Sequence, residues 1–127
     1  MSLLLRVTVF VEVPTGLCLL LVPGIILALL LGVQHPVAET LLAGRIAGAA
    51  LLGFGVAIWL TRKHASKPVQ QGLVAGMTLY TVAAAALLAY AGIVLKMVGI
   101  LLWPGFVFHA GFAVWCFMCL AGSSLTE

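Results

Sequence analysis

Four long apolar runs, separated by short polar links, constrain this chain more than any other feature of its sequence. A helix crosses the hydrocarbon core of a bilayer with about 20 apolar residues, and each run exceeds that length. Inside a bilayer, only helices and closed barrels satisfy every backbone polar group. The sequence therefore predicts an all-α fold, a polytopic membrane protein whose single domain is a bundle of four transmembrane helices. The predicted helices cover about residues 3–31, 37–61, 69–94 and 97–121.

The composition excludes a soluble globular domain. Of the 127 residues, 65% are hydrophobic and only 7% are charged, whereas a soluble domain has about a quarter charged and about half apolar residues. A net charge of +3 could indicate nucleic-acid binding. The cations, however, lie beside the apolar runs, as residues that orient membrane helices do. We therefore expect membrane lipids as partners, and no nucleic acid.

The cations also predict the orientation of the helices. With four spans, both termini lie on the same side as the link between the second and third runs. Cations near this side outnumber the two towards the other side, Arg45 and Lys96. By the positive-inside rule, we expect a multi-pass protein of the bacterial inner membrane with both termini in the cytoplasm. The four cytoplasmic cations are Arg6, Arg62, Lys63 and Lys67.

Prolines are expected to distort the first helix. The run over residues 3–31 is too long for one straight crossing, and it contains Pro14 and Pro23. Proline removes a backbone hydrogen bond and bends a helix. The sequence therefore predicts a kinked or tilted first helix.

Ionisable residues at bilayer depth are the candidate functional residues, because a charge in hydrocarbon is costly. At about 1.5 Å rise per residue, Glu12 and His109 lie at comparable depth in the first and fourth helices. Tyr80 in the third helix is the next candidate partner of Glu12. Arg45 lies nearer the outer surface, where its long side chain can reach lipid headgroups. We expect Glu12 to face the interior of the bundle.

Three interpretations of Glu12 remain open. Its carboxyl is a neutral acid hydrogen-bonded within the bundle, or it is paired with His109 or Arg45. Alternatively, it binds protons or cations in a transporter. The first two interpretations give Glu12 a structural role, and we favour them over transport.

Two GxxxG motifs predict close helix packing. Gly44 and Gly48 share one face of the second helix, and Gly72 and Gly76 share one face of the third. Such spacing lets two helix backbones approach each other. We expect these faces to pack within the bundle; the alternative is self-association into a homo-oligomer or a larger membrane complex.

Cys116 and Cys119 form a CxxC motif on the last helix. A redox dithiol needs an accessible thiol of low pKa, and a metal site needs more ligands than this segment supplies. Packing or lipidation is therefore the leading interpretation. The sequence contains no phosphate loop, Ser/His/Asp set or HExxH motif. It predicts no catalytic residues, no metal and no cofactor.

The segments AGRIAGAALLGFGVAIWLTRK, GMTLYTVAAAALLAYAG and LLWPGFVFHAGFAVWC resemble a group of small four-helix proteins of bacterial inner membranes. The layout of that group is similar to that of DoxX-like proteins. The resemblance implies the four-helix membrane fold and carries no catalytic residues over. Some DoxX-like relatives are subunits linked to quinone redox enzymes, but no quinone motif is present here.

The segment VEVPTG around Glu12 is similar to the first helix of small multidrug resistance transporters. In that family, the glutamate binds protons and cationic drugs. Only Glu12 carries over, because helices two to four lack the family's aromatic and glycine pattern. This resemblance implies a proton-coupled small-molecule transporter as one alternative function.

We therefore expect a small integral inner-membrane protein without catalysis, which packs or associates in the bilayer and can bind a lipid or another apolar ligand between its helices. The alternatives are the proton-coupled transporter centred on Glu12 and a redox accessory subunit using Cys116 and Cys119.

Overall fold

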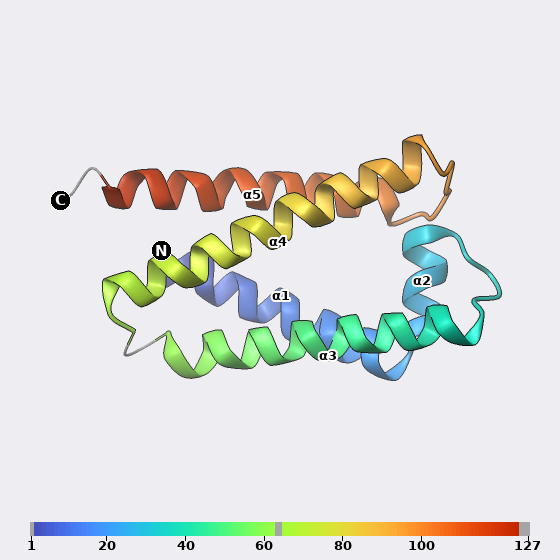
Figure 1. The fold of residues 1–127 in the computed structure, drawn as a ribbon, viewed down its shortest axis with the longest axis horizontal. Helices are drawn as coiled ribbons and strands as arrows, with labels where there is room; N and C mark the ends of the chain where they lie inside the picture. The colour runs from blue at the N-terminus through green and yellow to red at the C-terminus, as the bar shows by residue number, and fades with distance from the viewer. Residues whose placement is uncertain (1, 63–64, 125–127) are drawn as a thin grey trace.

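The computed structural model describes residues 2–62 and 65–124, and the regular secondary structure of this part of the chain is helical, with no strand. Four of its helices are long and apolar enough to cross a membrane, and they lie along the long axis of the molecule in Figure 1. The predicted all-α bundle of four spanning helices is confirmed, and the chain has the architecture of a multi-pass membrane protein. The helices are α1 (Ser2–Leu21), α2 (Pro23–Leu31), α3 (Ala38–Thr61), α4 (Lys67–Ile93) and α5 (Leu102–Ser124).

The first predicted helix is two helices, not one kinked helix. Val22 separates them, with φ −131° and ψ 53°, because the ring of Pro23 disfavours a helical conformation in the residue before it. Pro14, in contrast, remains inside α1. The nine residues of α2 are too few to span a bilayer. Figure 1 shows α2 lying across one end of the bundle, roughly perpendicular to α3.

The link between α4 and α5 is longer than the sequence predicts, so α5 begins at Leu102 and not near residue 97. Lys96 in this link has a φ of 54°, a left-handed conformation that interrupts the helix. Gly99 lies directly against the backbone of Leu30 in α2. The Leu101 N–H donates to the carbonyl oxygen of Leu29 at 2.8 Å. These contacts fasten α2 to the link and prevent an earlier start of α5.

The four long helices form two pairs, α1 with α3 and α4 with α5. The pairs meet in a core near the start of α1, where every long helix contributes at least one buried side chain. At the α2 end of the molecule the pairs are further apart in Figure 1. The core consists of Leu4, Leu5, Val9, Ile58, Val74, Met77, Phe112 and Cys116.

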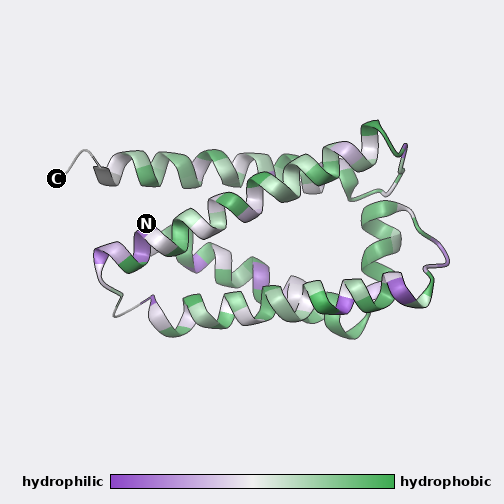
Figure 2. Cartoon of the chain, viewed as in Figure 1, coloured by the Kyte–Doolittle hydropathy of each residue, from purple (hydrophilic) through white to green (hydrophobic). Residues whose placement is uncertain are grey.

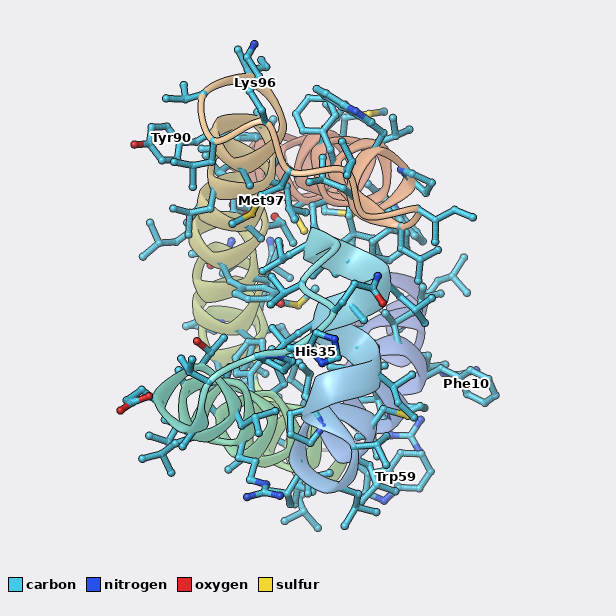
Figure 3. All side chains as sticks on the ribbon, turned by 90° about the vertical axis from the view of Figure 1, so that its right-hand side faces the viewer. Phe10, His35, Trp59, Tyr90, Lys96 and Met97 are labelled. Atoms are coloured by element: carbon cyan, nitrogen blue, oxygen red, sulfur yellow. The ribbon has the colours of Figure 1, made fainter. Side chains whose placement is uncertain are left out.

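The long helices are mainly hydrophobic along their middle, and hydrophilic residues gather mainly towards the ends of the bundle (Figure 2). Phe10 and Trp59 project outward (Figure 3), with exposed fractions of 84% and 54%. The guanidinium of Arg62 lies over the Trp59 ring, 3.7 Å from its centroid. Such a cation–aromatic contact suits the membrane interface. Of the predicted basic link, Lys63 lies outside the described residues.

Candidate functional site

Glycines bring α1 and α3 into backbone contact and thereby position Glu12. A Cβ on Gly48 would lie 2.7 Å from the Gly16 carbonyl oxygen, and one on Gly16 would lie 2.8 Å from the Gly48 carbonyl oxygen. Neither distance is tolerable for a real side chain. Further along α3, a Cβ on Gly55 would lie 2.7 Å from Cγ2 of Val13 and 3.7 Å from the Cβ of Glu12. Glu12 is therefore held against α3.

The two predicted GxxxG faces differ in the structure. Gly44 packs against Pro23, to which a Cβ would approach within 3.2 Å, and Gly48 packs against α1. Around Gly72 and Gly76, an added Cβ would meet nothing within 4 Å. This second motif is therefore not a contact face within the chain, because α4 packs through the other side of the helix. Gly16 could not be predicted as a contact residue, because it stands outside any GxxxG motif.

Three of the predicted intramembrane polar residues come together from three different helices. Glu12 on α1 is buried, with 5% of its surface exposed. It interacts electrostatically with Tyr80 on α4. The Tyr80 ring contacts the ring of His109 on α5 edge to face, with centroids 5.7 Å apart and planes at 86°. Glu12 borders neither of the two cavities between the helix pairs, but Pro14 and Thr15, which follow it in α1, border the second of them together with Tyr80 and His109. Arg45 is exposed on α3 and has no partner among the described residues.

Nearby buried hydroxyls are already hydrogen-bonded within their own helices. Thr8 donates to the Leu4 carbonyl oxygen at 2.9 Å. Thr78 and Thr81 likewise donate to carbonyls one turn earlier in α4, at 2.8 and 2.9 Å. Among the described residues, no hydrogen bond or ion pair involves the Glu12 carboxyl.

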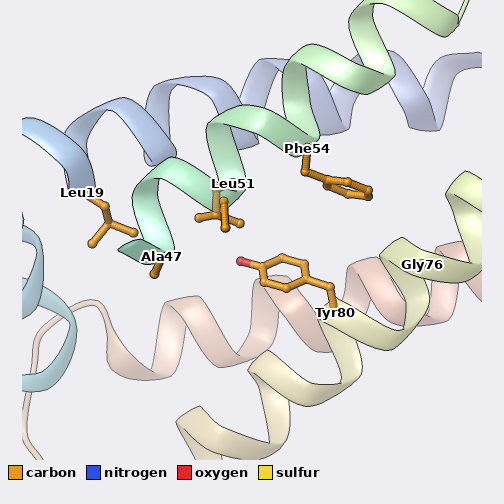
Figure 4. A pocket seen from close by; sticks show the side chains of 7 residues that line it. Leu19, Ala47, Leu51, Phe54, Gly76 and Tyr80 are labelled. Atoms are coloured by element: carbon orange, nitrogen blue, oxygen red, sulfur yellow. The ribbon is translucent and has the colours of Figure 1, made fainter. Parts of the chain in front are cut away.

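A first cavity of about 510 Å³ lies between α1, α3 and α4. In Figure 4, the Tyr80 hydroxyl points across it towards Leu51 and Ala47. Ala47 and Gly76 are exposed, so this cavity opens sideways between α3 and α4, in the middle of their spans. Its lining is Leu19, Ala47, Ala50, Leu51, Phe54, Gly76 and Tyr80. The sequence did not single out its apolar lining, because these residues resemble every other apolar residue of the helices.

A second cavity of about 480 Å³ adjoins the first. It shares Leu19, Leu51 and Tyr80 with the first cavity and extends towards α2 and α5. His109 borders it, and α2 contributes Ile26 and Leu30 to its wall. Because Tyr80 borders both cavities, the polar cluster of Glu12, Tyr80 and His109 lies beside the boundary between them.

The cysteines lie apart from these cavities, except for Cys18 in the wall of the second. All three are free thiols. Cys116 is completely buried in the core, and Cys119 packs against that core. A sealed thiol cannot meet a redox partner. Among the described residues, no group of three His, Cys, Asp or Glu side chains is placed to hold a metal ion.

No family model matches this chain, and no curated protein and no solved structure resembles it at a significant level.

Proposed function

We propose that this protein binds an apolar molecule, such as a lipid chain, in the two adjoining cavities between its helix pairs, without catalysis. The observation that carries this proposal is the pair of cavities themselves, about 510 and 480 Å³, with almost wholly apolar walls. Small-molecule sites in proteins are typically of about 300–1,000 Å³, mostly apolar, with a few polar groups that fix the orientation of the ligand. The cavities have this size and this composition.

The position of the first cavity gives the ligand a route from the bilayer. Its opening lies between α3 and α4, and Gly76 places no side chain across it. A lipid chain can therefore enter sideways without passing through water. The second cavity lies nearer the end of the bundle, where α2 forms part of its wall.

Photo-crosslinking tests this proposal. The probe is a phosphatidylcholine with a photoreactive group on one palmitoyl chain, incorporated in lipid nanodiscs with the purified protein. We expect crosslinks to gather on the segment around Leu51 and on the segment around Tyr80. Gly76→Phe fills the opening and should remove most of them. Gly72→Phe is the matched control, because Gly72 is equally open but borders neither cavity. Crosslinks spread evenly over the exposed faces, unchanged in Gly76→Phe, would contradict the proposal.

We further propose a bacterial inner-membrane location with both termini in the cytoplasm. The excess of cations near the link between α3 and α4 supports this orientation. The start of α1 and the end of α5 lie on the same side as that link in Figure 1, as four crossings require.

One observation favours proton-coupled transport as a second candidate function. Glu12 is buried in the middle of a membrane span, without a hydrogen bond among the described residues, and it lies within electrostatic reach of the cavity residue Tyr80. Such a carboxyl is costly to keep for structure alone. Proton uptake into proteoliposomes, followed with a trapped pH dye, tests it. If the protein transports protons, the wild type should show uptake. The Glu12→Gln variant should fold but show none.

A further inference from the structure

Tyr80 borders both cavities, and His109 borders the second beside it. We propose that Tyr80 and His109 bind the neutral oxygen of an otherwise apolar ligand, an ester or ketone carbonyl, by donating one hydrogen bond each. This inference rests on the proposed function, since it needs a ligand in the cavities.

A polar head group is needed for selective binding, because the bilayer and the cavities are both apolar environments for the ligand. A lipid chain that leaves the bilayer for an apolar cavity gains little from the hydrophobic effect, since the surrounding lipid is equally apolar. Preference must then come from shape and from hydrogen bonds. Among the described residues that line the first cavity, Tyr80 alone has a polar side chain. In the second cavity it is joined by His109, the Thr15 hydroxyl and the Cys18 thiol.

The burial of the His109 ring indicates which of its nitrogens carries the proton. Nδ1 is sealed and has no hydrogen-bond partner among the described residues. A proton on Nδ1 would have no acceptor, which is costly in an apolar surrounding. We therefore place the proton on Nε2, the nitrogen that is not sealed. His109 borders the second cavity, so Nε2–H can donate to a ligand there.

Tyr80 supplies the second donor. Its hydroxyl points across the first cavity (Figure 4), and no hydrogen bond of the described residues occupies it. The rings of Tyr80 and His109 are in contact, with centroids 5.7 Å apart. Both side chains border the second cavity, one from α4 and one from α5. A carbonyl oxygen has two lone pairs and accepts two such bonds.

The charges around the cluster exclude an ionised head group. Among the described residues, no Lys or Arg borders either cavity, so a carboxylate or phosphate would lack a counter-ion in an apolar surrounding. Glu12 is the nearest acidic group, and it interacts electrostatically with Tyr80. A second negative charge beside Tyr80 would be repelled by an ionised Glu12. The site therefore fits an ester or a ketone better than a fatty-acid anion.

The experiment compares three probes of equal chain length: methyl palmitate, hexadecane and palmitate. The protein is kept in dodecyl maltoside, a detergent without a carbonyl group, and binding is measured by equilibrium dialysis of radiolabelled probe. Infrared spectroscopy follows the ester carbonyl stretch, which moves to lower frequency when the oxygen accepts hydrogen bonds. Tyr80→Phe and His109→Leu each remove one donor, whereas His109→Gln keeps an N–H donor. Tyr90→Phe and His35→Leu are matched controls, since both residues are exposed outside the cavities.

We expect the wild type to bind methyl palmitate more tightly than hexadecane and palmitate. Tyr80→Phe and His109→Leu should each weaken ester binding about tenfold and reduce the infrared shift, with hexadecane binding unchanged. His109→Gln should restore most of the loss, and the two controls should behave as the wild type. Tyr80→Phe deletes a single oxygen atom and should keep the fold. It therefore still tests the proposal if the His109→Leu variant does not fold.

The outcomes separate this inference from the function on which it rests. Saturable binding of methyl palmitate and hexadecane with equal affinity, unaffected by Tyr80→Phe, would overturn the head-group assignment and leave the proposed function standing. Tighter binding of palmitate would overturn the choice of a neutral head. Saturable binding of none of the probes would contradict the proposed function itself.

Discussion

Glu12 is the residue whose burial is hardest to explain by packing. Its carboxyl lies within a membrane span, 5% exposed, and no hydrogen bond of the described residues holds it. A buried polar group without a partner destabilises a fold, and an apolar side chain of similar size removes that cost. The presence of a glutamate at this position therefore points to a role other than stability.

We expect Glu12→Leu to leave the free energy of unfolding unchanged or to raise it by up to about 1–3 kcal/mol. The measurement is unfolding by sodium dodecyl sulfate in mixed micelles, followed by circular dichroism. Thr8→Val is the matched control, one turn earlier on the same helix. It removes a hydroxyl that donates to the Leu4 carbonyl oxygen, so it should destabilise slightly. A marked loss of stability in Glu12→Leu would show that the carboxyl has a partner, such as a bound water.

Gly48 and Gly76 should respond oppositely to the same substitution. A Cβ on Gly48 would lie 2.7 Å from the Gly16 carbonyl oxygen and 2.9 Å from the Cβ of Leu19. Gly48→Ala therefore overpacks the contact between α1 and α3 and should destabilise by about 1–3 kcal/mol. Gly76→Ala meets no atom within 4 Å and should be neutral or slightly stabilising. Equal effects in the same unfolding assay would show that α1 and α3 do not meet at Gly48.

At the scale of the helices, the sequence predicts lengths better than contacts. The thickness of the bilayer fixes the length of an apolar run, so four spans could be predicted from length alone. The face through which each helix packs could not, because helices that are apolar all round carry no amphipathic pattern. Gly48 and Gly76 illustrate this: both stand in GxxxG motifs, yet only Gly48 is in contact. Self-association through Gly72 and Gly76 stays a prediction.

The prolines and the site residues likewise divide into predictable and unpredictable features. Pro14 and Pro23 lie in the same apolar run, but only Pro23 interrupts the helix. The residue type alone does not say which proline a membrane helix tolerates. The polar residues Glu12, Tyr80 and His109 could be singled out because they contrast with an apolar background. The walls of the cavities could not, because they emerge only when the two helix pairs are placed.

We expect α2 to depend on the glycine in the link that it contacts. Gly99 lies directly against Leu30, and a Cβ there would also approach the Leu31 nitrogen to 2.6 Å. Gly99→Val should therefore displace α2 from the end of the bundle. Hydrogen–deuterium exchange should rise over residues 23–31 and stay unchanged in α4. Gly53→Val, where a Cβ meets nothing within 4 Å, is the control. Unchanged exchange in Gly99→Val would show that α2 is held by other contacts.

For the whole molecule, the proposed orientation predicts which links meet the cytoplasm. We expect a membrane-impermeant maleimide to label Gln34→Cys in intact cells and Ser66→Cys only after the membrane is opened. Gln34 and Ser66 are both exposed and lie in links at opposite ends of the bundle. Labelling of the wild-type protein is the control, because it gives the background from its own three cysteines. Labelling of Ser66→Cys in intact cells would reverse the proposed orientation.

The pairing of the helices bears on how the chain enters the membrane. Because α4 packs on α5, its neighbour in sequence, while α3 returns to α1, the chain divides at the link between α3 and α4 into two halves that each close on themselves. Each half can thus insert as a unit, and the shared core joins them afterwards. Two separately synthesised fragments, divided at that link, should therefore assemble in one membrane and co-purify.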